Sequence, residues 1–523
     1  MRVTLRGFHR VDWPALAWAA RIGRDGGVEL FAGEAVERTE GGLLAAAWCG
    51  AYATTSPFDA TTSIGTALRL LPDRIEASCG NAGPDVLFLH RGAEGVVLAN
   101  GLPIALAAAD DAPLPDHPFY NHDLMAYLIT GAPAGTALPL RRGTVTPFYR
   151  GIALSAPGWR AMPLPLRPMP RVAGFAAYRA MLVAETAALF ANAADPARRQ
   201  RYTPIATMSS GYDSVAAAVI ARDAGCAEAL TWREAGMAAP GTLDSGEESA
   251  ARLGLAVTML PTHAYRARTD LPETEFIAAG YGGPQVIMAG SEAHLAGRLI
   301  VTGFAGDALW DRDHAPRRGA AICGGFSALS FHLRLPALAV AVPMIGAADD
   351  PAPLAALSRA VEMAPWTLGG DYDRPIPRRI AEEAGLPRGS FALRKLMATP
   401  AYATLGRGRL AVEGYLGDES AARFHAWLAA HGGVEQRARL RNRLVSPLAR
   451  LFWTGALPRA LRRCGIAWPP APRALWRLRH AVRDSALMSQ WAMDLELPPL
   501  RAALDSAGAG KAQLGPTLGR PLP

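Results

Sequence analysis

The stretch from Tyr202 to Gly225 reads YTPIATM-SSGYDS-VAAAVIARDAG. Its first seven residues predict a short buried strand, and its alanine-rich end predicts a helix that stops at Gly225. The turn between them offers backbone N–H groups, hydroxyl donors and the positive end of a helix dipole, which together suit a phosphate or pyrophosphate. Asp213, in the first helical turn, adds a carboxylate for a Mg²⁺ ion that bridges phosphate oxygens. The alternative is an ordinary strand–turn–helix connection with Ser and Asp caps.

This turn resembles the Ser-Gly-Gly-x-Asp-Ser pyrophosphate loop of the N-type ATP pyrophosphatases, in particular of the asparagine synthetase family. One glycine of that loop is replaced here by Ser210. The resemblance implies ATP and Mg²⁺ as cofactors. It also implies that the nucleotide is bound by the turn residues Ser209, Ser210, Gly211, Asp213 and Ser214.

A second motif, residues 298–310, reads RLIVTGFAGDALW and predicts a strand, a glycine turn and then Asp307. It resembles the Ser-Gly-x-Gly-x-Asp-Glu stretch of asparagine synthetases, although Phe304 replaces an acidic residue and Ala308 replaces the Glu. The resemblance implies that Asp307 joins Asp213 as a Mg²⁺ ligand, which suits an ion that takes its other ligands from phosphates. The alternative for Asp307 is a helix N-cap. The nucleotide-binding residues implied in this motif are Gly303, Gly306 and Asp307.

Between the two motifs the pattern alternates between strand and helix. Residues 227–232 predict a strand, residues 243–254 a capped helix and residues 255–260 another strand. Alternation of this kind predicts a parallel sheet wound on both faces, with ligands at the carboxyl ends of its strands. In the family that the chain resembles, the second strand ends at the adenine and ribose pocket, which makes Thr231 and Trp232 candidates for nucleotide contacts.

A third motif runs from residue 371 to residue 388, DYDRPIPRRIAEEAGLPR, and is followed by GSFALRKL. Pro377 is typical of a helix start and Gly385 of a helix end. Asparagine and β-lactam synthetases carry, in a comparable region, a lysine that stabilises charge during acyl-adenylate chemistry, and this resemblance makes Lys395 the candidate catalytic residue. Only two lysines, Lys395 and Lys511, occur in a chain that otherwise uses arginine. The alternative for Lys395 is a surface lysine.

The length of 523 residues predicts more than one domain. Residues 1–165 contain short strands separated by Gly, Pro and Asp, which predicts a β-rich sandwich. In glutamine-dependent asparagine synthetases this domain is an Ntn-hydrolase-like glutaminase with a cysteine directly after the initiator methionine. Arg2 occupies that position here, so we expect a degenerate domain that does not hydrolyse glutamine. Cys49 and Cys79 are interpreted as buried structural residues.

The fold class expected is therefore α/β: an N-terminal sandwich, a doubly wound ATP-pyrophosphatase domain and a helical C-terminal extension. Residues 161–170 contain four prolines and predict a stiff connector. The domains expected are residues 1–165, residues 171–400, a helical and arginine-rich extension over 401–505, and a disordered tail over 506–523. The extension is expected to cover the synthetase core. The alternative is a contact with an anionic membrane or a partner.

Composition narrows the function classes. The net charge of +8 comes almost wholly from arginine, and no zinc-finger spacing or basic repeat interleaved with aromatic residues supports nucleic-acid binding. The five cysteines lack CxxC spacing, and together with the lack of a signal segment this predicts a cytoplasmic protein.

The function expected is an ATP-dependent ligase that adenylates a carboxylate and couples it to an amine. Its substrates would be small molecules or peptides, and a cyclase of the macrolactam or β-lactam type is favoured. The alternatives are an ammonia-dependent asparagine synthetase and, in another class, a non-catalytic sensor of adenine nucleotides.

Overall fold

The computed structural model describes most of the chain. The described residues are 3–7, 13–39, 41–115, 117, 137–165, 172–235, 241–278, 284–312, 333–347, 351–369, 372–392, 396, 412, 414–453, 457, 460–461, 464, 466, 478, 482–506 and 512–513.

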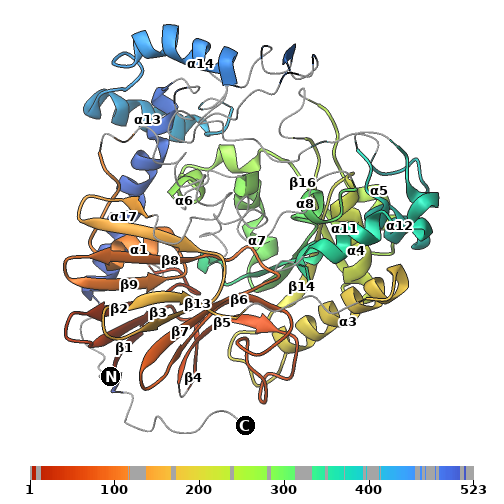
Figure 1. The fold of residues 1–523 in the computed structure, drawn as a ribbon, viewed down its shortest axis with the longest axis horizontal. Helices are drawn as coiled ribbons and strands as arrows, with labels where there is room; N and C mark the ends of the chain where they lie inside the picture. The colour runs from red at the N-terminus through yellow and green to blue at the C-terminus, as the bar shows by residue number, and fades with distance from the viewer. Residues whose placement is uncertain are drawn as a thin grey trace.

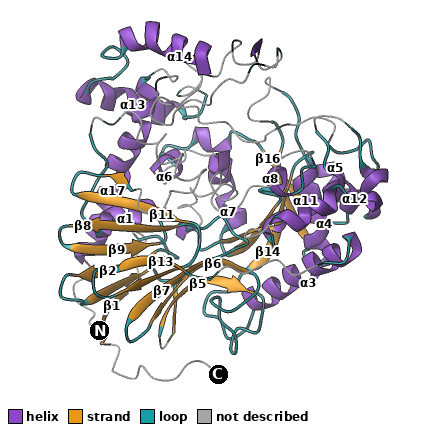
Figure 2. Cartoon of the chain, in the orientation of Figure 1, coloured by secondary structure: helices purple, strands orange, loops and turns teal. Residues whose placement is uncertain are grey.

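The N-terminal region consists of two sheets whose strands pair almost entirely antiparallel (Figure 1, Figure 2). The first sheet contains β1 (Val3–Gly7), β2 (Trp18–Gly23), β3 (Val28–Ala32), β8 (Leu87–Gly92), β9 (Gly95–Ala99), β10 (Leu138–Pro139), β11 (Gly143–Phe148) and β19 (Ala512–Gln513). Its order is β10-β11-β8-β9-β2-β3-β1-β19, and only β1 and β3 pair parallel. The second sheet contains β4 (Glu37–Thr39), β5 (Gly42–Trp48), β6 (Ser63–Leu70), β7 (Arg74–Cys79), β12 (Ile152–Ser155) and β13 (Arg160–Pro163). Its order is β13-β12-β7-β6-β5-β4.

The two sheets face each other across a shared core, as the predicted sandwich requires. The indole N–H of Trp18 in the first sheet donates to the hydroxyl of Thr66 in the second, at 2.9 Å. The amide of Asn100 donates to the same hydroxyl at 3.1 Å. All three side chains are buried, so these bonds satisfy polar groups that water cannot reach. Helix α1 (Leu102–Ala108) packs against the first sheet, at β2, β8 and β9.

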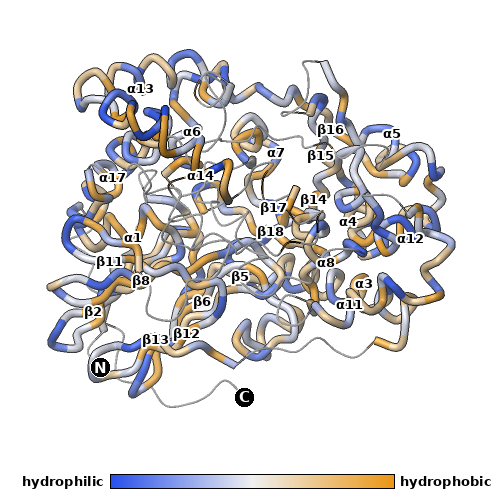
Figure 3. Tube along the Cα trace, turned by 45° about the horizontal axis from the view of Figure 1, so that its top comes forward, coloured by the Kyte–Doolittle hydropathy of each residue, from blue (hydrophilic) through white to orange (hydrophobic). Residues whose placement is uncertain are grey.

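The parallel sheet has five strands: β14 (Thr203–Met208), β15 (Glu228–Trp232), β16 (Ala256–Leu260), β17 (Arg298–Thr302) and β18 (Leu338–Ala341). Its order is β16-β15-β14-β17-β18, with every pair parallel. The tube along the middle of β17 is orange in Figure 3, where its sequence reads LIV, a continuous apolar run typical of a strand covered on both faces. The mixed α/β fold with antiparallel sheets and one parallel sheet is therefore confirmed.

The helices of this region are α3 (Phe175–Ala193), α4 (Tyr212–Asp223), α5 (Glu247–Arg252), α6 (Glu273–Ala278), α7 (Glu292–Leu295), α8 (Gly306–Leu309), α11 (Ala352–Ser358) and α12 (Pro375–Glu383). Short 3₁₀ turns are η1 (Ala264–Ala267), η2 (Pro284–Ser291), η3 (Val342–Met344) and η4 (Val361–Trp366). Helix α4 contacts the sheet, α3 and α12, and its residues 215–221 are fully buried. This explains its alanine-rich sequence, because small side chains allow neighbours to approach on every side.

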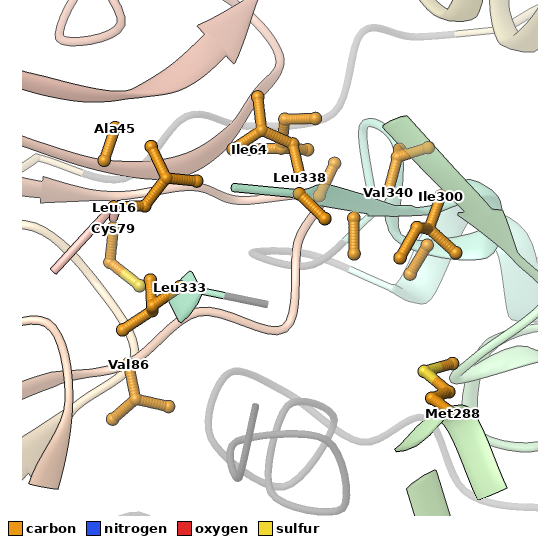
Figure 4. Close-up of a cluster of buried hydrophobic side chains, with 14 of the residues drawn as sticks. Leu16, Ala45, Ile64, Cys79, Val86, Met288, Ile300, Leu333, Leu338 and Val340 are labelled. Atoms are coloured by element: carbon orange, nitrogen blue, oxygen red, sulfur yellow. The ribbon is translucent and has the colours of Figure 1, made fainter. Parts of the chain in front are cut away.

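The parallel sheet and the sandwich share one continuous core. Figure 4 shows Leu338 and Val340 of β18 near Ile64 of β6, and all three belong to the same buried cluster. The backbone N–H of Ala341 donates to the carbonyl of Ala82 at 2.8 Å across this boundary.

The C-terminal region is helical: α13 (Asp418–His431), a π-helical turn η6 (Arg441–Val445), α14 (Ser446–Trp453), the 3₁₀ turn η8 (Asp484–Leu487) and α17 (Met488–Ser506). Helix α17 packs on both α6 and α1. Arg501 on α17 donates to the carbonyl of Asp111 at 2.7 Å. This extension therefore covers the sandwich as well as the parallel-sheet region, whereas the sequence predicted contact with the latter alone. No described helix is long and apolar enough to cross a lipid bilayer.

Three sequence predictions need correction. The helix expected over 243–254 begins only at Glu247, since Asp244 is bonded elsewhere. The start of the proline-rich connector forms β13, an edge strand, where proline is tolerated because one side of the strand needs no ladder bonds. Within the tail expected to be disordered, Ala512–Gln513 pair with β1, whose open edge offers unpaired backbone groups.

Candidate active site

The candidate site lies where the order of the parallel sheet changes direction. From β14 the chain goes on to β15 and β16 on one side, whereas β17 and β18 lie on the other. In open parallel sheets, the loops after two such strands diverge and leave a crevice at their carboxyl ends. The loops that flank this crevice are residues 209–211, after β14, and residues 303–305, after β17. These are the first two motifs of the sequence.

The loop after β14 is held by its own hydroxyl groups. The Ser209 and Ser214 hydroxyls lie 2.8 Å apart, and the backbone N–H of Ser209 donates to the Ser214 hydroxyl at 3.1 Å. The backbone N–H of Gly211 donates to the Ser209 hydroxyl at 3.2 Å. These bonds shape the loop, so Ser209 and Ser214 have a structural role whether or not a nucleotide binds.

Ser210, the residue that departs from the family's glycine, is bonded to Asp244. Its hydroxyl donates to a carboxylate oxygen of Asp244 at 2.5 Å, and its backbone N–H donates to the same oxygen at 3.2 Å. Asp244 is buried, and burial raises its pKa against the opposing effect of the Ser210 bonds. Asp244 therefore connects the loop after β14 to the segment that leads into α5.

The second motif lies directly against the first. A Cβ atom added at Gly303 would lie 2.2 Å from the backbone carbonyl carbon of Asp213, and one added at Gly306 would lie 2.3 Å from the Asp213 Cγ. Both distances are far below van der Waals contact, so only glycine fits at either position. Ala305, between them, has φ of 66°, a left-handed conformation that is uncommon without glycine. The close approach of these two motifs is the main geometric feature of the site.

Arg374 brings the third motif into the site. It precedes α12, is buried, and its guanidinium is paired with the Asp213 carboxylate. Its Nε lies 3.6 Å from a carboxylate oxygen of Asp311. Burial lowers the pKa of Arg374, but attraction by Asp213 and Asp307, together with the phenol of Tyr372, outweighs burial and raises it. A permanent cation therefore lies among three carboxylates.

A second buried arginine fixes the start of α4. The guanidinium of Arg378 donates to the hydroxyl of Tyr212 and lies 4.8 Å from the centre of its ring. Tyr212 also packs against Tyr372, with ring centres 4.8 Å apart, and Phe391 lies beyond it. Contacts from α12 thereby hold Tyr212, the first residue of α4, in place. Burial is the largest influence on the pKa of Tyr212 and raises it.

The residues fit an anionic phosphate. No side chain caps the N-terminus of α4, so the first-turn N–H groups point toward the crevice at the positive end of the helix dipole. An added Cβ at Gly211 would meet only two side-chain oxygens, at 3.4 and 3.9 Å. A phosphate can therefore approach the backbone closely at this point.

The residues also fit Mg²⁺ bound jointly with a nucleotide. No cluster of three or more His, Cys, Asp or Glu that could hold a metal ion occurs within the described part of the chain. Mg²⁺ in nucleotide sites needs only one or two carboxylates, because phosphates and waters complete its octahedron. Asp213 and Asp307 lie in the first turns of α4 and α8, directly after the two loops that flank the crevice, and can supply those carboxylates. The charge of Arg374 offsets part of this negative field.

Other sequence candidates lie in different surroundings. Thr231 is fully buried; its hydroxyl donates to the carbonyl of Met208 at 3.0 Å and accepts from the N–H of Gly246 at 2.8 Å. Trp232 is buried, and its indole N–H donates to the hydroxyl of Ser291 at 3.2 Å. The polar groups of Thr231 and Trp232 thus bond within the protein. Lys395 lies outside the described residues.

Sequence reasoning missed Asp244, Arg374 and Arg378. Arg374 and Arg378 lie in the third motif, within the residues DYDRPIPRR. The signal that could have identified them is the turn rich in carboxylates directly before a helix that starts with proline. Asp244 precedes a helix, so its position suggested a helix cap rather than a bond to Ser210.

No protein-family model matches the sequence, and no curated protein matches it.

Proposed function

We propose that the chain is an ATP-dependent ligase whose parallel sheet is a doubly wound ATP-pyrophosphatase domain of the asparagine synthetase type. The observation that carries the proposal is the contact of Gly303 and Gly306 with Asp213. Two motifs about 90 residues apart meet at the switch point of the sheet, where ligands of such sheets bind. In this proposal the sandwich corresponds to the glutaminase domain of that family.

The proposed reaction has two steps. A substrate carboxylate oxygen attacks the α-phosphorus of ATP, and the bond from that phosphorus to pyrophosphate breaks, which leaves an acyl-adenylate. An amine nitrogen then attacks the acyl carbon, loses a proton to solvent and displaces AMP. The products are an amide, AMP and pyrophosphate. We favour an intramolecular amine, as in peptide or small-molecule cyclases, because Arg2 stands where the glutaminases of that family have the cysteine that releases ammonia.

The residues have distinct roles in this proposal. The first-turn N–H groups of α4 bind phosphate oxygens, next to the loop of Ser209, Ser210 and Gly211. Arg374 holds the Asp213 carboxylate in place and compensates its charge before nucleotide binds. Asp213 and Asp307 would hold a Mg²⁺ ion, which would neutralise charge on the departing pyrophosphate. Lys395 remains our candidate for the cation that serves the acyl transfer.

The sandwich domain supports a reaction without glutamine. The thiol of Cys49 donates to the carbonyl of Glu185 at 3.1 Å, and that of Cys79 donates to the carbonyl of Asp85 at 2.8 Å. Cys79 is buried, as expected, whereas Cys49 is half-buried, and burial raises the pKa of its thiol far above neutrality. A protonated thiol is a poor nucleophile. Incubation with glutamine, ATP and Mg²⁺ should release no glutamate above background.

The test uses two aspartates at opposite ends of α4. Asp213→Asn should slow pyrophosphate release by about 10²–10³-fold, because it removes a charge from the phosphate site. Asp223→Asn, which removes a carboxylate paired with Arg179 at the other end, is the matched control and should leave the rate unchanged. Release is measured with Mg-ATP and a panel of amino acids and linear peptides. Wild-type turnover by Asp213→Asn at saturating ATP would contradict the assignment.

A second candidate, a non-catalytic adenine-nucleotide sensor, is favoured by one observation. In this structure Asp213 is bonded to Arg374 and Ser210 to Asp244, an arrangement that binding could rearrange without chemistry. A sensor would be stabilised by ATP, by about 2.7 kcal/mol at one hundred times the Kd, yet would leave the α–β bond of ATP intact with every carboxylate. A ligase would cleave that bond with at least one of them.

A further inference from the structure

The helix that begins at Arg439 and continues through η6 and α14 exposes leucine side chains. Leu440, Leu444, Leu448 and Leu451 are 72%, 55%, 54% and 47% exposed. Their spacing of four, four and three residues places them along one face. Half of the exposed large hydrophobic side chains in the described chain lie between positions 440 and 452. We call this face the leucine ridge.

The opposite face, which is small and polar, is the one that packs against the protein. Ser446 and Ala449 are buried. The side-chain amide of Asn442 donates to the carbonyl of Val482 at 2.7 Å and accepts from its N–H at 2.8 Å. Asn442 therefore fixes the rotation of the helix so that the leucine ridge faces outward. This reverses the usual arrangement of a surface helix, whose apolar face packs inward.

This helix lies in the part of the sequence that carries the excess positive charge of the protein. From residue 436 to residue 483 the sequence contains twelve arginines and no Asp or Glu, so the rest of the chain is net acidic. Arg439 and Arg443 flank the ridge, are both exposed and form no ion pair with any described residue. Together with Asn442, Gln436 and the carboxylates of Glu435 and Asp484, they line an open depression of about 560 Å³. Asp484 is itself bonded to two backbone N–H groups, of Val434 and Glu435.

We propose that the leucine ridge and its arginines form a docking surface for an anionic lipid bilayer. Helices of this composition lie in the membrane interface, where leucines enter the acyl boundary and arginines contact lipid phosphates. Figure 1 shows α14 at the outer edge of the molecule. The leucines project from one helix face, so a protein partner would need a matching groove, whereas a lipid surface can deform around them. Nucleic acid would account for the arginines and leave the leucines exposed to water.

The experiment is vesicle flotation with the full-length protein. Vesicles contain either phosphatidylcholine alone or equal parts of phosphatidylcholine and phosphatidylglycerol. Binding is expected only to the anionic vesicles and should weaken as salt is raised. Leu444→Gln/Leu448→Gln and Arg439→Gln/Arg443→Gln should each lower the affinity by about 10-fold or more. The arginine variant should also show a smaller dependence on salt.

Matched controls use exposed side chains outside the segment. Met162→Gln/Val361→Gln removes two exposed apolar residues, and Arg252→Gln/Arg423→Gln removes two arginines that form exposed helix pairs. Both control variants should bind vesicles like the wild type. Equal binding by wild type and the Leu444→Gln/Leu448→Gln variant would overturn the proposal. Failure of the wild type to bind anionic vesicles would also overturn the proposal. If the leucine variant then disrupted the oligomeric state of the protein, the ridge would be assigned to contact between copies of the chain.

Discussion

The carboxyl edge of the parallel sheet and the leucine ridge depart in opposite directions from the rule that folded proteins usually bury apolar side chains and expose charged ones. At the sheet edge a buried guanidinium, Arg374, lies among carboxylates, and on the ridge leucines lie in water. Each arrangement is held by specific bonds, the Arg374–Asp213 pair in one and the Asn442–Val482 bonds in the other. Folding alone favours neither, since buried charges and exposed apolar side chains both lower stability. The two regions differ in how much they contribute to the free energy of unfolding: we expect a large contribution from the buried Arg374 and a small one from the exposed leucines. Measurements of unfolding can test this difference.

The largest effect is expected at Arg374. Arg374→Ala leaves the carboxylates of Asp213 and Asp311 in a buried site without their cation. Removal of one partner from such a pair typically destabilises by about 3–5 kcal/mol. Denaturant unfolding of Arg374→Ala and of Arg374→Ala/Asp213→Ala should show partial recovery in the double variant. Arg423→Ala, in an exposed helix pair, is the control. An equal loss of unfolding free energy in Arg374→Ala and Arg423→Ala would contradict the expected difference between buried and exposed charge.

The close approach of the two motifs is tested at Gly303. Its added Cβ would meet the backbone of Asp213 at 2.2 Å, and backbone cannot move aside as a flexible side chain can. Gly303→Ala should destabilise by about 3 kcal/mol and abolish stabilisation by Mg-ATP. Gly41→Ala is the matched control, since nothing lies within 4 Å of its added Cβ. A wild-type melting curve for Gly303→Ala, with ATP binding retained, would refute the packing of the second motif on the first.

A half-buried carboxylate with a shifted pKa lies away from both regions, at Glu496 on α17. Burial, then repulsion by Glu275, raises its pKa from 4.5 to about 7, although Thr274 and Arg334 act in the opposite direction. Between these pH values the folded state holds more protons than the unfolded state, so stability falls as pH rises from 4.5 to about 7. Glu496→Gln should therefore be more stable than wild type by about 2 kcal/mol near pH 8 and nearly equal to it near pH 5.

The control for this pH dependence is Glu419→Gln, an exposed residue paired with Arg423. Thermal melts across the pH range should show no comparable gain for that variant. A Glu496→Gln difference that is constant with pH would mean that the wild-type carboxyl is already ionised throughout.

A smaller, local effect is expected at Asn442. Asn442→Ala removes both bonds to Val482, each worth about 1 kcal/mol. Hydrogen exchange in residues 439–453 should accelerate by about 30-fold, while the parallel sheet keeps its protection. Gln436→Ala, an exposed residue two turns away, should leave exchange unchanged. Faster exchange over the whole chain would show that the helix is part of the global folding unit.

The smallest effect is expected on the ridge itself. Leu444→Gln/Leu448→Gln should change the free energy of unfolding by no more than about 0.5 kcal/mol, because both side chains already face water and Gln keeps the helix propensity. Leu338→Ala, in buried β18, should cost about 2–5 kcal/mol by contrast. A large loss in the ridge variant, measured by denaturant unfolding, would mean that the leucines pack inside the protein.

Local patterns were sufficient to predict several elements. The apolar run 203–208 and the alanine-rich segment after it became β14 and α4, since strand and helix follow from propensity and turn chemistry within a few residues. The strands at residues 228–232 and 256–260 followed for the same reason. Composition also identified residues 401–505 as an arginine-rich extension.

What the sequence by itself determined is therefore the set of elements, the glycine-rich turns and the distribution of charge, all of which depend on neighbours along the chain. Only the tertiary structure decided that Arg374 meets Asp213 across 161 positions, that Asp244 bonds to Ser210, and that Asn442 turns the leucines outward. The physical reason is that periodicity shows which face of an element is apolar, whereas the partner and the rotation of that face are set by packing and by hydrogen bonds between distant segments.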